Sequence, residues 1–229
     1  LRIPEVRADA LVLRPPPVDP DEMLMDPQTY RDLELFEGGA AASLFDLCNT
    51  TRTVGGAKVL AARMRKPWNK ATKIRAVQES LEFVRAHRPA FDRLPTAMIT
   101  HEVDQYLAGS LPIVTSEGGI GFLIEAFAVR FGDFRPYAQI VRGVQLTSKV
   151  IRALRGLIRH PAFPATGGKG DIEPLLTELV SLIELPAFAV VTDDEDWSQS
   201  ALKVMVSDRT FRRRERIAVQ RMLQLIYEI

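Results

Sequence analysis

The sequence contains two clusters of basic side chains that could bind phosphate groups. One lies between Lys58 and Lys66, and the other between Arg209 and Arg216. Ammonium and guanidinium groups bind phosphate oxygens, and such contacts give affinity for nucleic acid without reading its bases. The candidate contacts to DNA or to a partner are Lys58, Arg63, Arg65, Lys66, Arg209, Arg212, Arg213, Arg214 and Arg216. The competing interpretation is a solvated helix face or ion pairs within the chain.

The second cluster poses an electrostatic question. Its arginines fall within about two turns at the start of a predicted helix. Positive charge at a helix start opposes the helix macrodipole. We therefore expect either acidic neighbours or DNA phosphates to balance this charge.

No pattern in the sequence predicts a nucleotide site. The run Gly167-Gly168-Lys169-Gly170 is superficially similar to a phosphate-binding loop. That loop needs G-x-x-x-x-G-K-S/T, in which the first glycine starts the cradle and the hydroxyl holds Mg²⁺. Here Phe163 occupies the first glycine position and Gly170 the hydroxyl position, so a flexible connection is the better interpretation.

Metal-binding and catalytic patterns are not evident either. The three histidines lie on separate segments, and His101-Glu102 has no second histidine four residues further on. The acidic run Asp193–Asp196 is explained as a helix start stabilised by the dipole. Cys48 lies between apolar residues, so we expect it to be packed as a small hydrophobe. We predict no catalytic residue, no metal and no cofactor, and we do not expect this chain to be an enzyme by itself.

The first basic cluster should lie on a short amphipathic helix. Asp26 and Pro27 suit the N-cap and first position of an earlier helix. Thr53 can cap the next helix, which ends before Pro67. Its apolar face contains Ala57, Leu60, Ala61 and Met64. Gly56 in its first turn marks either a close backbone approach or a weak start.

The middle of the chain reads as further helices. Ile74, Val77, Leu81 and Val84 step by three and four residues, and Thr72 can cap their helix. A second helix is expected over 96–108, followed by a loop over 109–121. The segment 120–131 is apolar on nearly every side, so it should be buried or form a partner surface.

The last part of the chain is also predicted to be helical. Pro136 opens a long helix to about residue 159, and Asp171 caps another that ends at Pro186. Residues 187–192 have a strand-like composition without a partner strand. A helix capped by Asp193 and Asp194 should end at Val206, and Ser207 or Asp208 should start the next. The apolar stripe of that last helix is Phe211, Ala218, Met222, Leu225 and Ile229.

These patterns predict an all-α fold, a multi-helix bundle with long helices. Residues 1–25 are rich in proline and should be extended, with Val12, Leu13 or Met23 able to form one strand-like contact. Residues 26–229 should form a helical domain, subdivided into 26–108 and 120–229.

The first part of this domain contains the run Asp26-Pro27-Gln28-Thr29-Tyr30-Arg31-Asp32-Leu33-Glu34-Leu35. This run resembles the D-x-x-T-x-x-N-L-E-L entry to the core, or lever, domain of MutS-type mismatch repair ATPases, with Asp32 in place of the asparagine. A second family pattern, S-L-x-x-x-L-D-x-T-x-T-x-x-G-x-R-x-L, continues in register. The matching positions are Ser43, Leu44, Asn49, Thr51, Thr53, Gly56, Lys58 and Leu60, with Asn49 for Asp and Lys58 for Arg. The resemblance covers about residues 26–85.

The resemblance implies a role within a larger protein. MutS-type proteins are dimeric DNA-binding ATPases whose helical core links DNA engagement to ATP hydrolysis. ATP and Mg²⁺ would then be held by a downstream ATPase domain that is not in this sequence, and the full-length protein would be a homodimer. The Phe-x-Glu wedge of mismatch-binding domains is missing, so the expected ligand of the full-length protein is mismatched or otherwise structured DNA. The alternative is a self-contained helical module that binds a protein partner through 120–131.

Composition limits the function classes. The 229 residues are 46% hydrophobic and 26% charged, as in an ordinary globular protein. The net charge is +1, so attraction to DNA must come from local patches. One cysteine fits a reducing compartment, and we expect a cytoplasmic protein without a membrane partner, because no stretch of about eighteen apolar residues occurs.

Overall fold

The computed structural model describes residues 21–39, 42–116, 118–132, 134–161, 169–192 and 200–229. Within these residues the chain is helical and has no strand, which confirms the all-α class. Most of the predicted extended segment 1–25 lies outside the described residues. At its end, Glu22 and Trp68 form an isolated antiparallel bridge, and the Met23 amide donates to the Pro67 carbonyl at 2.7 Å. This is the strand-like contact expected at Met23.

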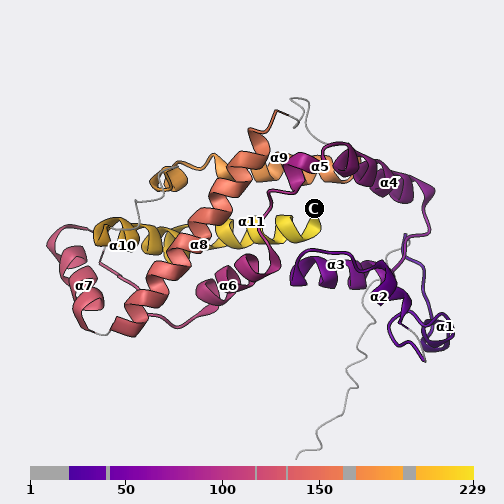
Figure 1. Ribbon diagram of the computed structural model, residues 1–229, viewed down its shortest axis with the longest axis horizontal. Coiled ribbons are helices and arrows are strands. Elements are labelled where there is room, and N and C mark those ends of the chain that lie inside the picture. Colours follow the sequence, from indigo (N-terminus) through magenta and orange to yellow (C-terminus); the bar gives the residue numbers. More distant parts are fainter. Residues whose placement is uncertain (1–20, 40–41, 117, 133, 162–168, 193–199) are drawn as a thin grey trace, which may run out of the picture.

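Figure 1 shows the helices arranged in an elongated body, with α1 and α7 toward opposite ends. The elements in chain order are α1 (Pro27–Asp32), α2 (Leu44–Cys48), α3 (Val54–Arg65), α4 (Ala71–Ala86), α5 (Arg88–Phe91), α6 (Ala97–Ala108), α7 (Gly119–Gly132), α8 (Phe134–Ile158), α9 (Ile172–Ile183), the 3₁₀ helix η1 (Pro186–Val190), α10 (Ala201–Arg209), the π-helical turn η3 (Thr210–Arg214) and α11 (Arg216–Glu228).

Several helices begin where a capping side chain predicts. Asp26 accepts a hydrogen bond from the Thr29 amide at 2.8 Å, and Thr53 accepts one from the Gly56 amide at 2.9 Å. The predicted cap at Thr72 is wrong, because α4 starts at Ala71 without a side-chain cap. Instead, the Asp21 carboxylate pairs with lysines beside this helix start, Lys70 and Lys73, which ties the preceding chain to α4. The Asp171 side chain likewise makes no capping bond at the start of α9.

Two helices organise the core. The long α8 crosses the body (Figure 1) and buries one stripe of side chains, Ile140, Val144, Ile151, Leu154 and Leu157. The last helix, α11, packs against α3, α6 and α9. The predicted stripe on α11 faces this core, with Val219, Leu223 and Ile226 buried beside it. The helix α3 packs against α11, and α6 packs against both α8 and α11. The two predicted subdivisions, 26–108 and 120–229, therefore share extensive contacts.

The predicted break before the last helix is wrong. Ser207 and Asp208 are buried inside α10, and the chain passes through η3 directly into α11. Figure 1 shows α10 and α11 running end to end. A π-helical turn inserts one residue into the hydrogen-bonding pattern, so it rotates the following side chains without ending the rod. The predicted caps Asp193 and Asp194 lie outside the described residues.

The region around α2 and α4 is more open than the rest. Cys48 is exposed, so the expectation that it is packed is wrong. The reason is that α2 is a five-residue helix with no buried side chain. On α4, Ile74 and Leu81 of the predicted stripe are also exposed, and Phe83 is the buried residue. The strand-like segment 187–192 lies largely in η1, where Phe188 is buried.

Candidate functional site

Arg212, from the second basic cluster, is an interior residue. Its side chain and that of Asp208 are 1% and 0% exposed. The two form a bidentate ion pair, with Nε to Oδ1 at 2.7 Å and Nη2 to Oδ2 at 2.8 Å. Asp208 thus supplies an acidic neighbour of the kind expected to balance the charge of this cluster, although no helix starts at this residue.

The ion pair belongs to a larger buried network. The Tyr106 hydroxyl of α6 donates to Asp208 Oδ1 at 2.7 Å. Arg212 also donates to the carbonyl of Leu111 at 3.0 Å and to that of Pro112 at 2.7 Å. Burial, together with the Asp208 carboxylate, raises the pKa of Tyr106 far above its ordinary value. A buried ion pair is tolerated when further hydrogen bonds satisfy its remaining groups, as they do here.

Space for the Tyr106 ring is provided by a glycine on the neighbouring helix. A Cβ atom at Gly143 of α8 would collide with the Tyr106 ring. The helices α6 and α8 therefore approach closely at this point, and Tyr106 reaches between them to Asp208. The network thus joins the α6–α7 connection to the α10–α11 rod.

The connection between α6 and α7 is held by two further side chains. Arg213 donates to the Thr115 carbonyl from η3. From α7, Glu125 accepts hydrogen bonds from the Thr115 amide at 2.6 Å and the Ser116 amide at 3.1 Å. Hydrogen bonds from Ser116 and Thr115 lower the pKa of Glu125 to about 2.

The other arginines of the second cluster point in different directions. Arg209 is buried with its guanidinium 5.7 Å from the centre of the Phe122 ring. Its Nε and Nη2 have no hydrogen-bond partner among the described residues. Arg214 and Arg216 are exposed. The predicted set of contacts is thus divided, with Arg209 and Arg212 inside and Arg213, Arg214 and Arg216 at the surface.

The first basic cluster lies entirely at the surface of α3 and its C-cap. Lys58 is exposed. Two arginines cover aromatic rings, with Arg63 5.3 Å from the centre of the Trp68 ring and Arg65 4.4 Å from that of Phe36. Lys66 pairs with Glu22 at 3.1 Å. All four cations are accessible to solvent. Three of them, Arg63, Arg65 and Lys66, also contact an aromatic or acidic neighbour.

The two clusters lie toward opposite ends of α11. The helix α3 meets α11 near its C-terminal end, where a Cβ at Gly55 would collide with the Tyr227 ring. Gly56, the position that matches the family pattern, is buried beside the Thr53 hydroxyl. Since Arg216 begins α11, it lies about 17 Å along the helix from Tyr227. The structure therefore does not gather the nine candidate cations into one patch.

A cleft of about 500 Å³ lies between α3, α6 and α11. Its polar lining residues include Lys58, His101, Asp104 and Tyr227. The Tyr227 hydroxyl donates to Asp104 Oδ2 at 2.5 Å. Burial and this hydrogen bond raise the pKa of Tyr227. The cleft thus holds hydrogen-bonding groups from all three helices.

The sequence does not predict that Tyr106, Gly143 and Asp208 belong to one buried network, and Asp208 is expected there only as a possible helix start. The spacing of Asp208 and Arg212, four residues apart on one helix, was the available signal for their ion pair. Nothing local to the sequence indicates that Tyr106 and Gly143 meet them.

The described residues contain no cluster of three side chains able to hold a metal ion. Among the same residues, no helix combines the length and apolar character that a membrane span needs. A comparison with known proteins finds no matching family model, no matching curated protein and no matching solved structure.

Proposed function

We propose that this chain is the helical core, or lever, region of a MutS-like DNA-binding ATPase. In this role it relays ATP-driven movement of a motor domain, encoded outside this sequence, to bound DNA. ATP and Mg²⁺ act in that motor domain, and the helices described here contribute no catalytic group.

The observation that carries the proposal is the packing of α3 on α11. The helix α3 contains the end of the MutS-like pattern, and its capping Thr53 and buried Gly56 have structural roles. Close packing at Gly55 and Tyr227 joins this helix to the last helix of the chain. A movement applied to α11 would therefore pass directly to α3, as a coupling element requires.

Buried contacts along the α10–α11 rod also support a mechanical role. The Asp208–Arg212 pair and Tyr106 bind the middle of the rod to α6 and to the α6–α7 connection. Packed interiors transmit displacement because they are dense and resist deformation. The buried network therefore makes α6, α10 and α11 move as one unit.

Contacts to DNA phosphates would come from the exposed cations, Lys58, Arg63, Arg65, Lys66, Arg213, Arg214 and Arg216. Their division between two ends of α11 predicts weak binding by this chain alone. Each phosphate contact contributes a slope of about −0.9 to the dependence of log affinity on log salt. We expect binding that falls steeply with salt and does not depend on base sequence.

The first test is the reading frame beyond the Ile229 codon. A downstream G-x-x-x-x-G-K-S/T followed by a further ATPase domain would support the proposal, and an open frame without this motif would overturn it. In the full-length protein, Gly55→Ala should reduce the stimulation of ATPase activity by DNA while basal hydrolysis is retained. Gly156→Ala, where a Cβ meets no atom within 4 Å, is the matched control and should leave the stimulation unchanged.

One observation favours the second candidate function, a helical module that binds a protein. The outer face of α7 exposes a row of large apolar side chains. Such faces mark interaction surfaces. This candidate predicts a stable complex without ATP or DNA, whereas the lever function predicts that coupling requires both.

A further inference from the structure

The helix α7 carries two apolar stripes. The inner stripe packs against the core and consists of Phe122, Ala126 and Val129. The outer stripe faces solvent, its members being 53–77% exposed: Ile120, Leu123, Ile124, Phe127 and Phe131. The sequence predicts that the segment 120–131 is buried or forms a partner surface. One face of α7 is buried against the core, and the other face is exposed to solvent.

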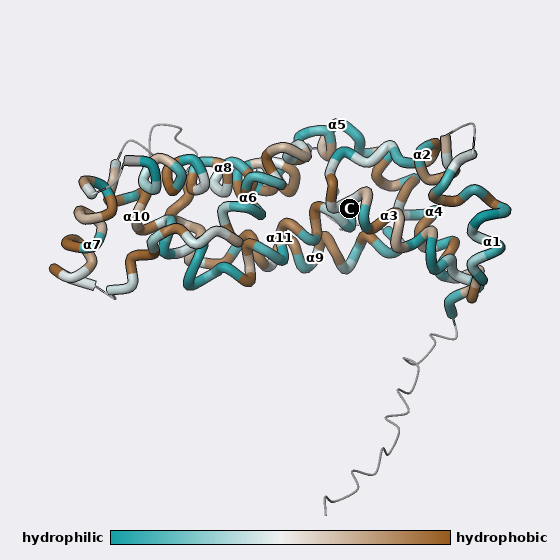
Figure 2. The backbone as a smooth tube through the Cα atoms, turned by 90° about the horizontal axis from the view of Figure 1, so that it is seen from below, coloured by the Kyte–Doolittle hydropathy of each residue, from teal (hydrophilic) through white to brown (hydrophobic). Residues whose placement is uncertain are grey.

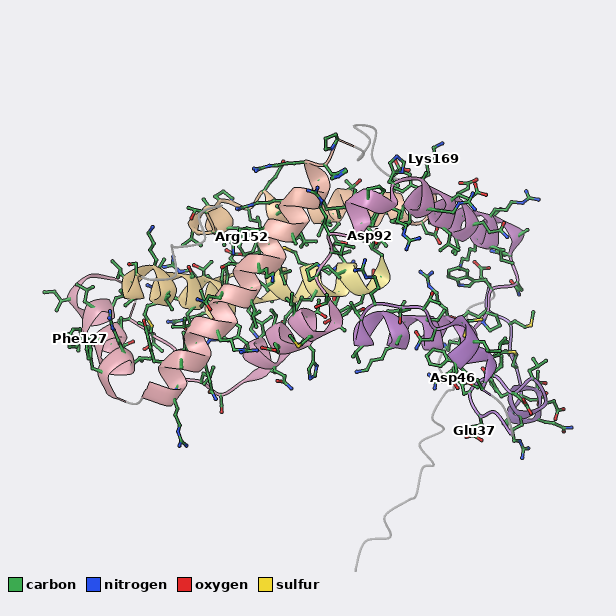
Figure 3. The ribbon with its side chains drawn as sticks, in the orientation of Figure 1. Glu37, Asp46, Asp92, Phe127, Arg152 and Lys169 are labelled. Carbon is green, nitrogen blue, oxygen red and sulfur yellow. The ribbon has the colours of Figure 1, made fainter. Side chains whose placement is uncertain are left out.

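The outer stripe is continuous along the helix. Its residues are spaced by three and four, so they lie along one side of α7. The rings of Phe127 and Phe131 lie 4.2 Å apart, between their centres. Figure 3 shows Phe127 at the outer end of the molecule, and Figure 2 shows hydrophobic stretches along α7 at the same end. From Ile120 to Phe131 the stripe extends about 17 Å along the helix.

The two charged residues of α7 leave the outer stripe free of a carboxylate. The acidic residue of α7, Glu125, is held by the backbone and side chains of Thr115 and Ser116. Its basic residue, Arg130, lies 5.3 Å from the centre of the Phe131 ring and extends the surface as a flat cation. A second apolar stripe could therefore cover this face without burying a carboxylate.

We propose that the outer stripe of α7 binds the same stripe of a second copy of this chain, around a two-fold axis. Two-fold pairing of one patch with itself is the commonest arrangement in homo-oligomers. Side chains spaced by three and four on both helices can interdigitate in the shallow crossing typical of helix pairs. The pairing is a contact of this chain itself and is independent of the lever function and of any motor domain.

The area of the outer stripe and the net charge of the chain both fit a second copy of this chain as the partner. The five side chains are 53–77% exposed, and an aromatic side chain alone can bury about 150–250 Å², so their exposed parts amount to about 600 Å² per copy. Two copies then bury about 1,200 Å², which is the lower end of specific protein interfaces. The net charge of +1 causes little repulsion between copies. A membrane surface fits less well, since interfacial helices carry several lysines or arginines and α7 has one arginine.

Sedimentation equilibrium over low to high micromolar concentration tests the proposal. We expect a monomer–dimer equilibrium for the unmodified chain. Phe127→Glu places a charge in the interface and should raise the dissociation constant about 100-fold or more. The matched control is Ile217→Glu on α11, at a large apolar side chain that is 82% exposed, and it should leave the dimer unchanged. Far-ultraviolet circular dichroism checks that both variants keep their helices.

A cross-linking experiment locates the contact. Since Cys48 is exposed, the background is Cys48→Ser, into which Ile124→Cys or Ile217→Cys is introduced. Oxidation should give disulfide-linked dimers with Ile124→Cys and not with Ile217→Cys. A wild-type chain that stays monomeric at high micromolar concentration would overturn the proposal, as would a dimer that survives Phe127→Glu.

Discussion

The two basic clusters look alike in the sequence and differ in the structure. The cluster on α3 is a surface feature, in which Arg63 and Arg65 lie over aromatic rings. The cluster around η3 is divided by the surface, with Arg212 held inside by Asp208. The number of cations in a cluster therefore does not decide their role. Arg212 has an acidic residue one turn away and a tyrosine from another helix beside it. These two neighbours make it a structural residue, although the sequence suggests a phosphate-binding one.

The clusters also differ in what they hold together. On α3 and its C-cap, three of the four basic side chains meet a neighbour close to their own end of the molecule, such as Glu22 or Trp68. Around η3, the arginines bind the carbonyls of Leu111, Pro112 and Thr115, about a hundred residues earlier. The second cluster therefore fixes tertiary structure, and we expect its loss to affect the whole fold.

The largest expected effect comes from removing the acidic partner of the interior cluster. Asp208→Ala leaves Arg212 as an uncompensated buried charge, which costs about 3–5 kcal/mol. Urea denaturation followed by circular dichroism measures this loss. The matched change in the surface cluster, Glu22→Ala, removes the partner of Lys66 and should cost less than about 1 kcal/mol. Equal losses in the two variants would contradict the distinction between the clusters.

A second prediction concerns the space that the interior network needs. Gly143→Ala pushes the Tyr106 ring away from Asp208 and should destabilise the fold by about 1–3 kcal/mol. Gly156→Ala on the same helix meets no neighbour and should stabilise it by about 0.5–1 kcal/mol. Thermal unfolding should therefore shift in opposite directions. A rise in the unfolding temperature of Gly143→Ala would show that Tyr106 adapts without cost.

The aromatic contacts of the surface cluster give a smaller effect. Arg65→Ala removes the guanidinium over Phe36 and should cost about 0.5–1 kcal/mol, the value for exposed cation–π contacts. Arg65→Lys keeps the charge but not the planar group, and its stability should lie between those of the two other forms. Chemical denaturation of the three forms gives this order, and a loss as large as that of Asp208→Ala would contradict it.

The smallest effect is expected at Glu125, which holds the connection that Arg212 and Arg213 bind from the other side. The pKa of Glu125 is lowered to about 2 from an ordinary value of 4.5. A carboxylate with a depressed pKa in the folded state contributes fully above pH 4.5, and this contribution is lost as the pH falls toward 2. The difference in unfolding midpoint between wild type and Glu125→Gln should therefore be constant above pH 4.5 and shrink below it. A constant difference down to pH 2 would assign the effect to packing.

Much of the local structure was predictable from the sequence because its causes are local. Asp26 and Thr53 each cap a helix through a bond to the amide three residues further on. Phe211, Met222 and Leu225 are spaced for one helix face, and that face is buried. Such contacts depend on residues within one or two turns, so they do not require knowledge of the rest of the fold.

The candidate site was less predictable. Arg212 was grouped with the exposed arginines because its neighbours in the sequence are also basic. Its burial depends on Tyr106, on the room left by Gly143 and on the carbonyl of Leu111. These residues are distant along the chain, and no periodicity links them to Arg212.

The helical class, several helix starts and the apolar stripe of the last helix follow from the amino-acid sequence. Hydrogen bonds and side-chain spacing within a few residues set these features. The burial of particular charges, the exposure of Cys48 and the open apolar face of α7 depend instead on how the helices pack together. Burial depends on what the remaining helices cover, and that follows from packing between segments far apart in the chain.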